Sequence, residues 1–87
     1  MPEKKFDPGK DKTLRTWNVP QGQDKFLVVK VAQYGEGQPK IQIGPSYVLG
    51  KDVDGSVNKV WIKTGRIDTN TTRLLIETLE EAIEFIE

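Results

Sequence analysis

The sequence predicts an α+β domain in which a four-stranded antiparallel sheet is followed by one C-terminal amphipathic helix. Three observations lead to this β-β-β-β-α order. Segments rich in β-branched residues alternate between apolar and polar side chains up to residue 63. Clusters of glycine, proline and aspartate separate these segments. From residue 70 onward, apolar residues instead recur at the spacing of a helix.

The N-terminal residues 1–12 are rich in proline, glycine and lysine and cannot bury enough apolar surface to fold alone. We therefore expect a flexible basic arm over 1–12 and a single domain over 13–87. The first strand is predicted at 13–19, with Pro20 ending it because proline cannot donate to a ladder. Neither face of this segment is clearly apolar, which favours an edge position.

The second predicted strand, 25–34, is the strongest in the chain. Leu27, Val29 and Val31 form one apolar face, and the other face carries Phe26, Val28, Lys30, Ala32 and Tyr34. A hairpin connection at 35–39 leads to a strand at 40–43, in which Ile41 and Ile43 are expected to face the core and Lys40 and Gln42 to face outward. The pair Gly44-Pro45 is expected to bend or interrupt this strand, with 46–49 as its predicted continuation.

A polar loop at 50–56 precedes the fourth strand, 58–63. Asp52 and Asp54 suggest a calcium loop, but the twelfth position, which requires glutamate, is Lys63, so we reject calcium. In the strand, Val60 and Ile62 point one way, whereas Lys59, Trp61 and Lys63 point the other. A tryptophan between two lysines on a solvent-facing side is unusual.

The helix is predicted to begin near Asn70, after several good capping residues at 68–71. Its apolar stripe consists of Leu75, Leu79, Ala82, Ile83 and Ile86, widened by Leu74 and Phe85. The opposite face is acidic. Residues 70–87 contain five glutamates and one arginine, whereas residues 1–69 contain twelve basic and eight acidic side chains. The zero net charge therefore conceals a basic body and an acidic helix.

The composition argues against catalysis and metal binding. The chain has no cysteine and no histidine, which removes the commonest general base and metal ligands, and no phosphate loop or dinucleotide fingerprint is present. We expect no enzyme activity, no cofactor and no metal site. No apolar run approaches the roughly 20 residues of a membrane span, and no signal peptide is recognisable. We therefore expect an intracellular protein of the cytoplasm and nucleoid, or of the nucleus in a eukaryote, without membrane contact.

The outward strand faces combine aromatic rings with cations, which is the pattern of a single-stranded nucleic-acid surface. These faces carry Phe26, Lys30, Tyr34, Lys40, Gln42, Lys59, Trp61 and Lys63, joined by Arg15 and Trp17 if the first strand presents the same side. Duplex DNA fits less well, because the only predicted helix is acidic. Two alternatives remain: an RNA-binding protein, and a protein-interaction module in which the acidic helix face or the aromatic sheet face docks a partner protein.

The run from Phe26 to Ile86 resembles the single-stranded-DNA-binding domain of the positive cofactor four family of transcriptional coactivators. The matching features are the hairpin FLVVKVAQYGEGQPKIQI, the strand ending in Lys63-Thr64-Gly65-Arg66-Ile67, and the helix after Asp68-Thr69-Asn70. The chain departs from the family in its longer 50–56 loop and in Gly44-Pro45, and it lacks the family's serine-rich and acidic N-terminal region.

The resemblance implies a homodimer that binds single-stranded DNA with little sequence preference, alongside transcription or replication proteins. It carries over the basic and aromatic strand positions Lys30, Tyr34, Lys40, Lys59, Trp61, Lys63 and Arg66 as nucleic-acid-binding residues.

Overall fold

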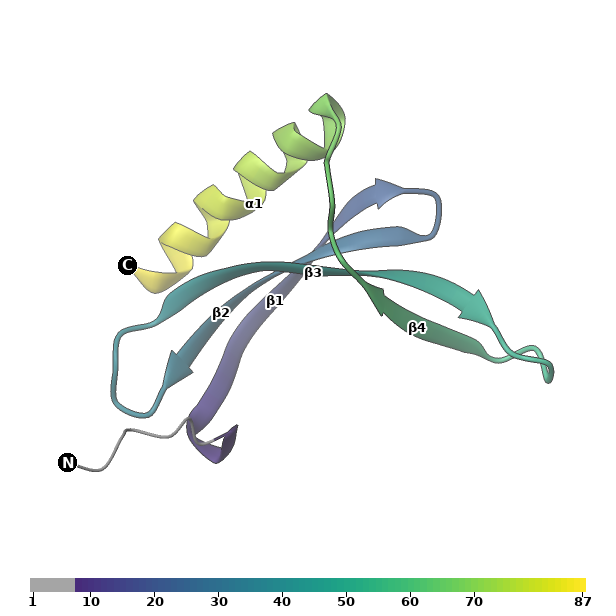
Figure 1. Ribbon diagram of the computed structural model, residues 1–87. Coiled ribbons are helices and arrows are strands. Elements are labelled where there is room, and N and C mark those ends of the chain that lie inside the picture. The colour runs from purple at the N-terminus through teal and green to yellow at the C-terminus, as the bar shows by residue number, and fades with distance from the viewer. Residues whose placement is uncertain (1–7) are drawn as a thin grey trace.

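The computed structural model describes residues 8–87. Strands β1 (Asp11–Gly22), β2 (Lys25–Tyr34), β3 (Lys40–Lys51) and β4 (Val57–Ile62) form one antiparallel sheet in chain order, and helix α1 (Thr69–Ile86) follows (Figure 1). A short 3-10 turn, η1 (Pro8–Lys10), precedes β1. The predicted fold class, an antiparallel four-stranded sheet followed by one C-terminal helix, is confirmed.

The boundaries of β1 and β3 differ from those predicted. β1 begins at Asp11 and continues through Pro20 to Gly22, so the prediction that Pro20 ends the strand is wrong. β1 is an edge strand, where a residue without an amide hydrogen can face solvent. Part of the predicted arm is structured, since residues 8–12 form η1 and the start of β1, while residues 1–7 lie outside the described residues. β3 also runs without a break through Gly44-Pro45.

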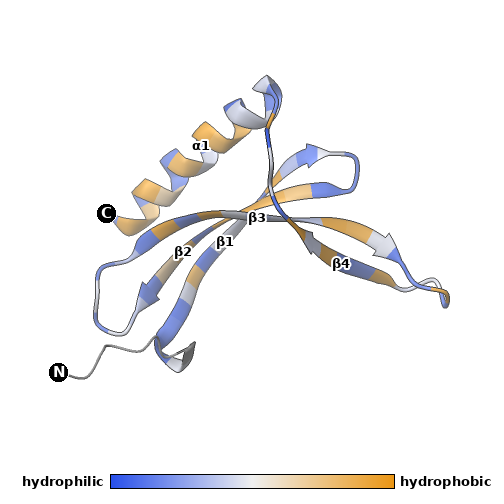
Figure 2. Ribbon diagram, in the orientation of Figure 1, coloured by the Kyte–Doolittle hydropathy of each residue, from blue (hydrophilic) through white to orange (hydrophobic). Residues whose placement is uncertain are grey.

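The core lies between α1 and the β1–β2 half of the sheet. Leu27 and Val29 of β2 are buried with Val19 of β1, and Leu75 and Leu79 of α1 pack against them. This is the predicted apolar face of β2, and Figure 2 shows apolar residues in the middle of β2 and repeatedly along α1. The alternation of β2 and the helical spacing of the leucines thus specify this contact.

Within residues 8–87, the sheet has three irregularities in register, and two of them reverse the alternation within the central parts of β1 and β3. In β1, Thr13 pairs with Ala32 but Arg15 pairs with Val31, so Leu14 is an extra residue. In β3, the pairs Val29–Ile43 and Leu27–Ser46 leave Gly44 and Pro45 opposite the single residue Val28. An extra residue in one strand moves the following side chains to the other face. These bulges decide which side chains share a face with Trp61.

α1 covers only part of the sheet. It packs against β1 and β2, whereas the far half of β3 and β4 extends beyond the helix as a two-stranded arm (Figure 1). Ile43 lies on the helix side, opposite Val29, as predicted, but it is 53% exposed because α1 does not cover it. Within the predicted helical stripe, Ala82 is buried but Ile83 and Ile86 are exposed.

The start of α1 is fixed by Asp68. The Asp68 carboxylate accepts a hydrogen bond of 2.7 Å from the backbone N–H of Thr71, and Asp68 is the N-cap. This bond lowers the pKa of Asp68, because the N–H group stabilises the ionised carboxylate. In residues 8–87, no helix has the length and apolar character needed to cross a membrane.

Candidate nucleic-acid interface

The sheet face opposite α1 is termed the open face. Residues that pair directly across antiparallel strands lie on the same face, so the register defines its members. They are Asp11, Thr13, Thr16, Asn18 and Pro20 of β1; Phe26, Val28, Lys30, Ala32 and Tyr34 of β2; Lys40, Gln42, Tyr47, Leu49 and Lys51 of β3; and Val57, Lys59 and Trp61 of β4.

Three aromatic side chains form a continuous cluster across the open face. The rings of Phe26 and Tyr47 are stacked with centroids 5.4 Å apart, and Trp61 meets Tyr47 edge-on at 5.3 Å. Tyr47 is only 5% exposed, whereas Trp61 is 55% exposed. The solvent-accessible indole ring of Trp61 therefore packs against the buried ring of Tyr47.

Polar contacts fix the central tyrosine from two sides. Its hydroxyl donates to Oδ1 of Asn18 at 3.2 Å, and Nζ of Lys59 lies 4.7 Å from the centroid of its ring. A cation over an aromatic face is attracted by the ring quadrupole. Lys59 is thus placed next to the aromatic cluster with its positive charge on the solvent side.

A hollow of about 250 Å³ opens beside Trp61. Val28, Lys30, Gln42, Gly44, Pro45 and Trp61 line it. Nε2 of Gln42 donates to the carbonyl of Gly44 at 3.0 Å, which fixes the amide at the floor of the hollow. An indole, an ammonium and an amide therefore meet around one concavity.

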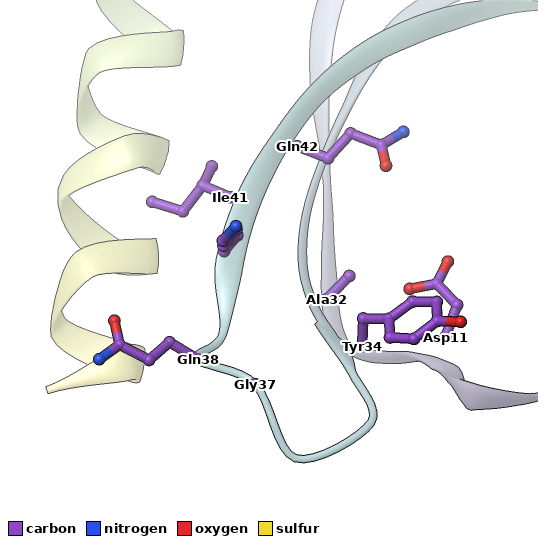
Figure 3. Close-up of a pocket in the computed structure, with 8 residues that line it drawn as sticks. Asp11, Ala32, Tyr34, Gly37, Gln38, Ile41 and Gln42 are labelled. Carbon is purple, nitrogen blue, oxygen red and sulfur yellow. The ribbon is translucent and has the colours of Figure 1, made fainter. Parts of the chain in front are cut away.

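A second hollow, of about 230 Å³, lies further along the open face (Figure 3). It is lined by Asp11, Ala32, Tyr34, Gly37, Gln38, Lys40, Ile41 and Gln42. Gln42 lines both hollows, so they are neighbours on β3. Together the two hollows form a path along the sheet. Each hollow contains one aromatic residue and one lysine, Trp61 with Lys30 in the first and Tyr34 with Lys40 in the second.

The chain matches no protein-family model, no curated protein and no solved structure. The interpretation of the open face therefore depends on the geometry of its own side chains.

Five of the seven predicted binding residues share the open face. They are Lys30, Tyr34, Lys40, Lys59 and Trp61. Lys63 and Arg66 instead lie in the segment between β4 and α1, where both are exposed. The structure thus brings the strand residues together and leaves these two cations on a connecting segment next to the sheet.

Arg15 and Trp17 do not join the open face, because β1 presents these two side chains on the other side of the sheet. The bulge at Leu14 turns both side chains toward α1. There, Nε1 of Trp17 donates to Glu81 at 3.0 Å, its ring meets Phe85 edge-on at 6.2 Å, and the Arg15 guanidinium lies 4.7 Å from the Trp17 centroid. Trp17 and Arg15 therefore attach the helix to the sheet.

Tyr47 and Asp11 are two of the open-face residues that alternation in the sequence did not predict there. The face of Tyr47 depends on the one-residue excess at Gly44-Pro45, and that of Asp11 depends on β1 beginning before Thr13. Glycine followed by proline inside an apolar strand is a signal for a bulge, although it does not specify how many residues are extra.

A buried polar group anchors the segment that carries Lys63 and Arg66. The hydroxyl of Ser46 donates to Oε1 of Gln21 at 2.8 Å and lies 3.0 Å from Oγ1 of Thr64. Nε2 of Gln21 in turn donates to the carbonyl of Thr64 at 3.1 Å. These bonds join the ends of β1 and β4 at the bulge of β3, and they limit where the exposed cations of the segment can reach.

Proposed function

We propose that the protein binds single-stranded DNA through the open face, with little dependence on sequence, in transcription, replication or repair. The observation that carries the proposal is the half-exposed Trp61 ring beside Lys30 in one hollow. Bases stack on exposed aromatic rings for about 1–3 kcal/mol each, whatever their identity. Lys30, Lys40 and Lys59 supply positive charge for the phosphates that accompany the stacked bases. The resemblance to the positive cofactor four family supports the same function.

A single strand suits this surface better than a duplex. The open face is a sheet with shallow hollows, and unpaired bases can turn into them. In the part of the chain that the structure describes, the one α-helix is on the opposite face and presents glutamates to solvent, which phosphate repels. The strand would therefore lie along the sheet and avoid α1.

We further propose that two copies of the chain associate through the α1 side of the molecule. Apolar side chains remain exposed there on α1, on β3 and on β4, including Ile83, Ile76, Ile43 and Val60. Exposed apolar patches on a small domain are typical of interaction surfaces. A dimer formed on this side leaves both open faces accessible to DNA.

The function is tested by titrating a fluorescent oligo-dT strand with the wild-type protein, Trp61→Ala and Lys30→Ala. We expect Trp61→Ala to lower the affinity roughly 5- to 150-fold, which corresponds to the loss of one stacked base. Lys30→Ala should make the slope of log affinity against log salt shallower by about 0.7. Both residues line an open hollow, so far-UV circular dichroism should be unchanged.

Lys25→Ala is the matched control. Lys25 is on the same strand but alternates with Leu27 onto the α1 side, so its removal should leave both affinity and salt slope nearly unchanged. Equal affinities for all four proteins would overturn the assignment of the open face. Absence of any binding to oligo-dT would favour a protein-interaction module, and stronger binding to oligo-U would favour RNA.

A further inference from the structure

The open face contains one carboxylate in addition to its lysines. Asp11 pairs with Tyr34 across β1 and β2, and both side chains line the second hollow. Figure 3 shows the Asp11 carboxylate beside the Tyr34 ring. The Asp11 side chain is exposed, and its carboxylate forms no hydrogen bond or ion pair with another side chain in 8–87. An ionised carboxylate on the path of a polyanion repels phosphate, so the group that binds beside it should be a hydrogen-bond donor and not a phosphate.

We propose that the hollow at Asp11, Tyr34 and Lys40 is a subsite for a guanine base, an inference that rests on the proposed binding of single-stranded DNA. An ionised carboxylate only accepts hydrogen bonds, and its two oxygens can accept two parallel N–H groups. Guanine offers such a pair on its Watson–Crick edge, namely the ring N1–H and the 2-amino group. The subsite thus selects one base along a path that otherwise ignores sequence.

The other bases match the carboxylate less well. Adenine and cytosine each place an acceptor nitrogen next to their amino group, and that lone pair faces the second carboxylate oxygen. Thymine has one N–H between two carbonyl oxygens. Each of these edges therefore combines one attractive contact with at least one repulsive contact. Guanine is the base whose donors match both oxygens.

The neighbouring side chains fit the same ligand. Tyr34 is 38% exposed and supplies an aromatic surface beside the carboxylate. Lys40 pairs with Ala32 on the next strand and places an ammonium on the opposite side of the hollow from β1. A base whose edge reaches Asp11 can stack on the tyrosine while its phosphate lies toward β3 and the lysine. In this orientation the base lies next to the negative charge of Asp11, and the phosphate lies next to the positive charge of Lys40.

The inference is tested with short oligo-dT strands in which a single guanine is moved through every position, so that no multi-guanine structure can form. We expect the best position to bind roughly 5- to 150-fold more tightly than plain oligo-dT, the range for one bidentate base contact. Inosine at that position should lose most of the gain, because it lacks the 2-amino group. In Asp11→Asn, the ratio of guanine to thymine affinities should fall to about one, while the affinity for plain oligo-dT stays equal or rises.

Asp24→Asn is the matched control, because it removes the same charge at the turn that joins β1 and β2. It should leave the guanine ratio intact. Persistence of the ratio in Asp11→Asn, an equal gain with inosine, or no gain at any position would overturn the guanine subsite while oligo-dT binding still stood. Failure of every strand to bind would overturn the proposed function as well.

Discussion

Among single residues, Tyr47 determines the geometry of the open face. It is buried between Phe26 and Trp61, and its hydroxyl bonds to Asn18. A large, buried aromatic residue stabilises the folded protein mainly through packing, and its hydrogen bond adds a smaller contribution to stability. Trp61 can remain half exposed in a defined orientation because this ring supports its edge.

Substitutions at Tyr47 should separate packing from hydrogen bonding. We expect Tyr47→Ala to lower the free energy of unfolding by about 3–5 kcal/mol, because it leaves a cavity under Trp61. Tyr47→Phe keeps the ring and should cost only about 0.5–1.5 kcal/mol. Urea denaturation measures both values. Equal losses in the two variants would contradict a dominant role for packing.

The elements differ in how far the sequence alone could place them. The β-branched run 25–34 and the spacing of Leu75, Leu79 and Ala82 predicted β2, α1 and the contact between them. The faces of β1 and β3 were harder to predict, because one extra residue moves all later side chains to the opposite face. Strand propensity does not indicate whether a strand contains such an extra residue. The sequence consequently left the face of Trp17 open and did not predict that Tyr47 lies on the open face.

The same argument applies to the candidate site. Alternation within β2 predicted that Lys30 and Tyr34 share a face, and alternation within β4 predicted the same for Lys59 and Trp61. The two pairs lie on one face of the sheet because of the bulge in β3, which the alternation does not reveal. Asp11 fell within a segment predicted to be flexible because of its composition. In the structure, Asp11 belongs to β1 because it pairs with Tyr34 of β2. Pairing between segments far apart in the chain is difficult to predict from local sequence.

The capping residue of α1 should make stability depend on pH. Hydrogen bonding to Thr71 lowers the pKa of Asp68 in the folded protein below its unfolded value of about 3.9. The contribution of the ionised cap is therefore complete above that unfolded value and is lost as the pH falls through the folded pKa. Asp68→Asn should retain most of the cap but show a shallower loss of stability below about pH 4.

Asp68→Ala completes that comparison. It removes the acceptor for the Thr71 N–H and should lower the denaturation midpoint at neutral pH, whereas Asp68→Asn should lower it less. Thermal unfolding monitored by circular dichroism at several pH values measures both effects. Identical pH profiles for the wild-type protein and Asp68→Asn would show that other carboxylates dominate the acid transition.

Over the whole molecule, the apolar surface and the charge are unevenly distributed. Exposed isoleucines gather on the α1 side, and the lysines of the path lie on the other side. A domain of this size buries a modest share of its surface when it folds alone. Association through the apolar side would add buried area without covering the proposed DNA path.

The proposed dimer predicts that stability depends on protein concentration. We expect the melting temperature of the wild-type chain to rise with concentration, because dilution favours dissociated and unfolded chains. Ile83→Glu, which places a charge among the exposed apolar residues of α1, should yield a monomer in sedimentation velocity. Val53→Glu, at the fully exposed tip between β3 and β4, should remain dimeric. A monomeric wild-type protein would contradict the proposal.

The outward glutamates of α1 also bear on the kinetics of encounter. Because cations lie on one face and Glu77, Glu80 and Glu84 are on the helix that covers the other, this neutral molecule has an electric dipole across the sheet. The field of a nucleic-acid strand would exert a torque on that dipole and turn the lysines toward the strand before contact. Orientation could then raise the association rate of a protein that has no net charge to attract it.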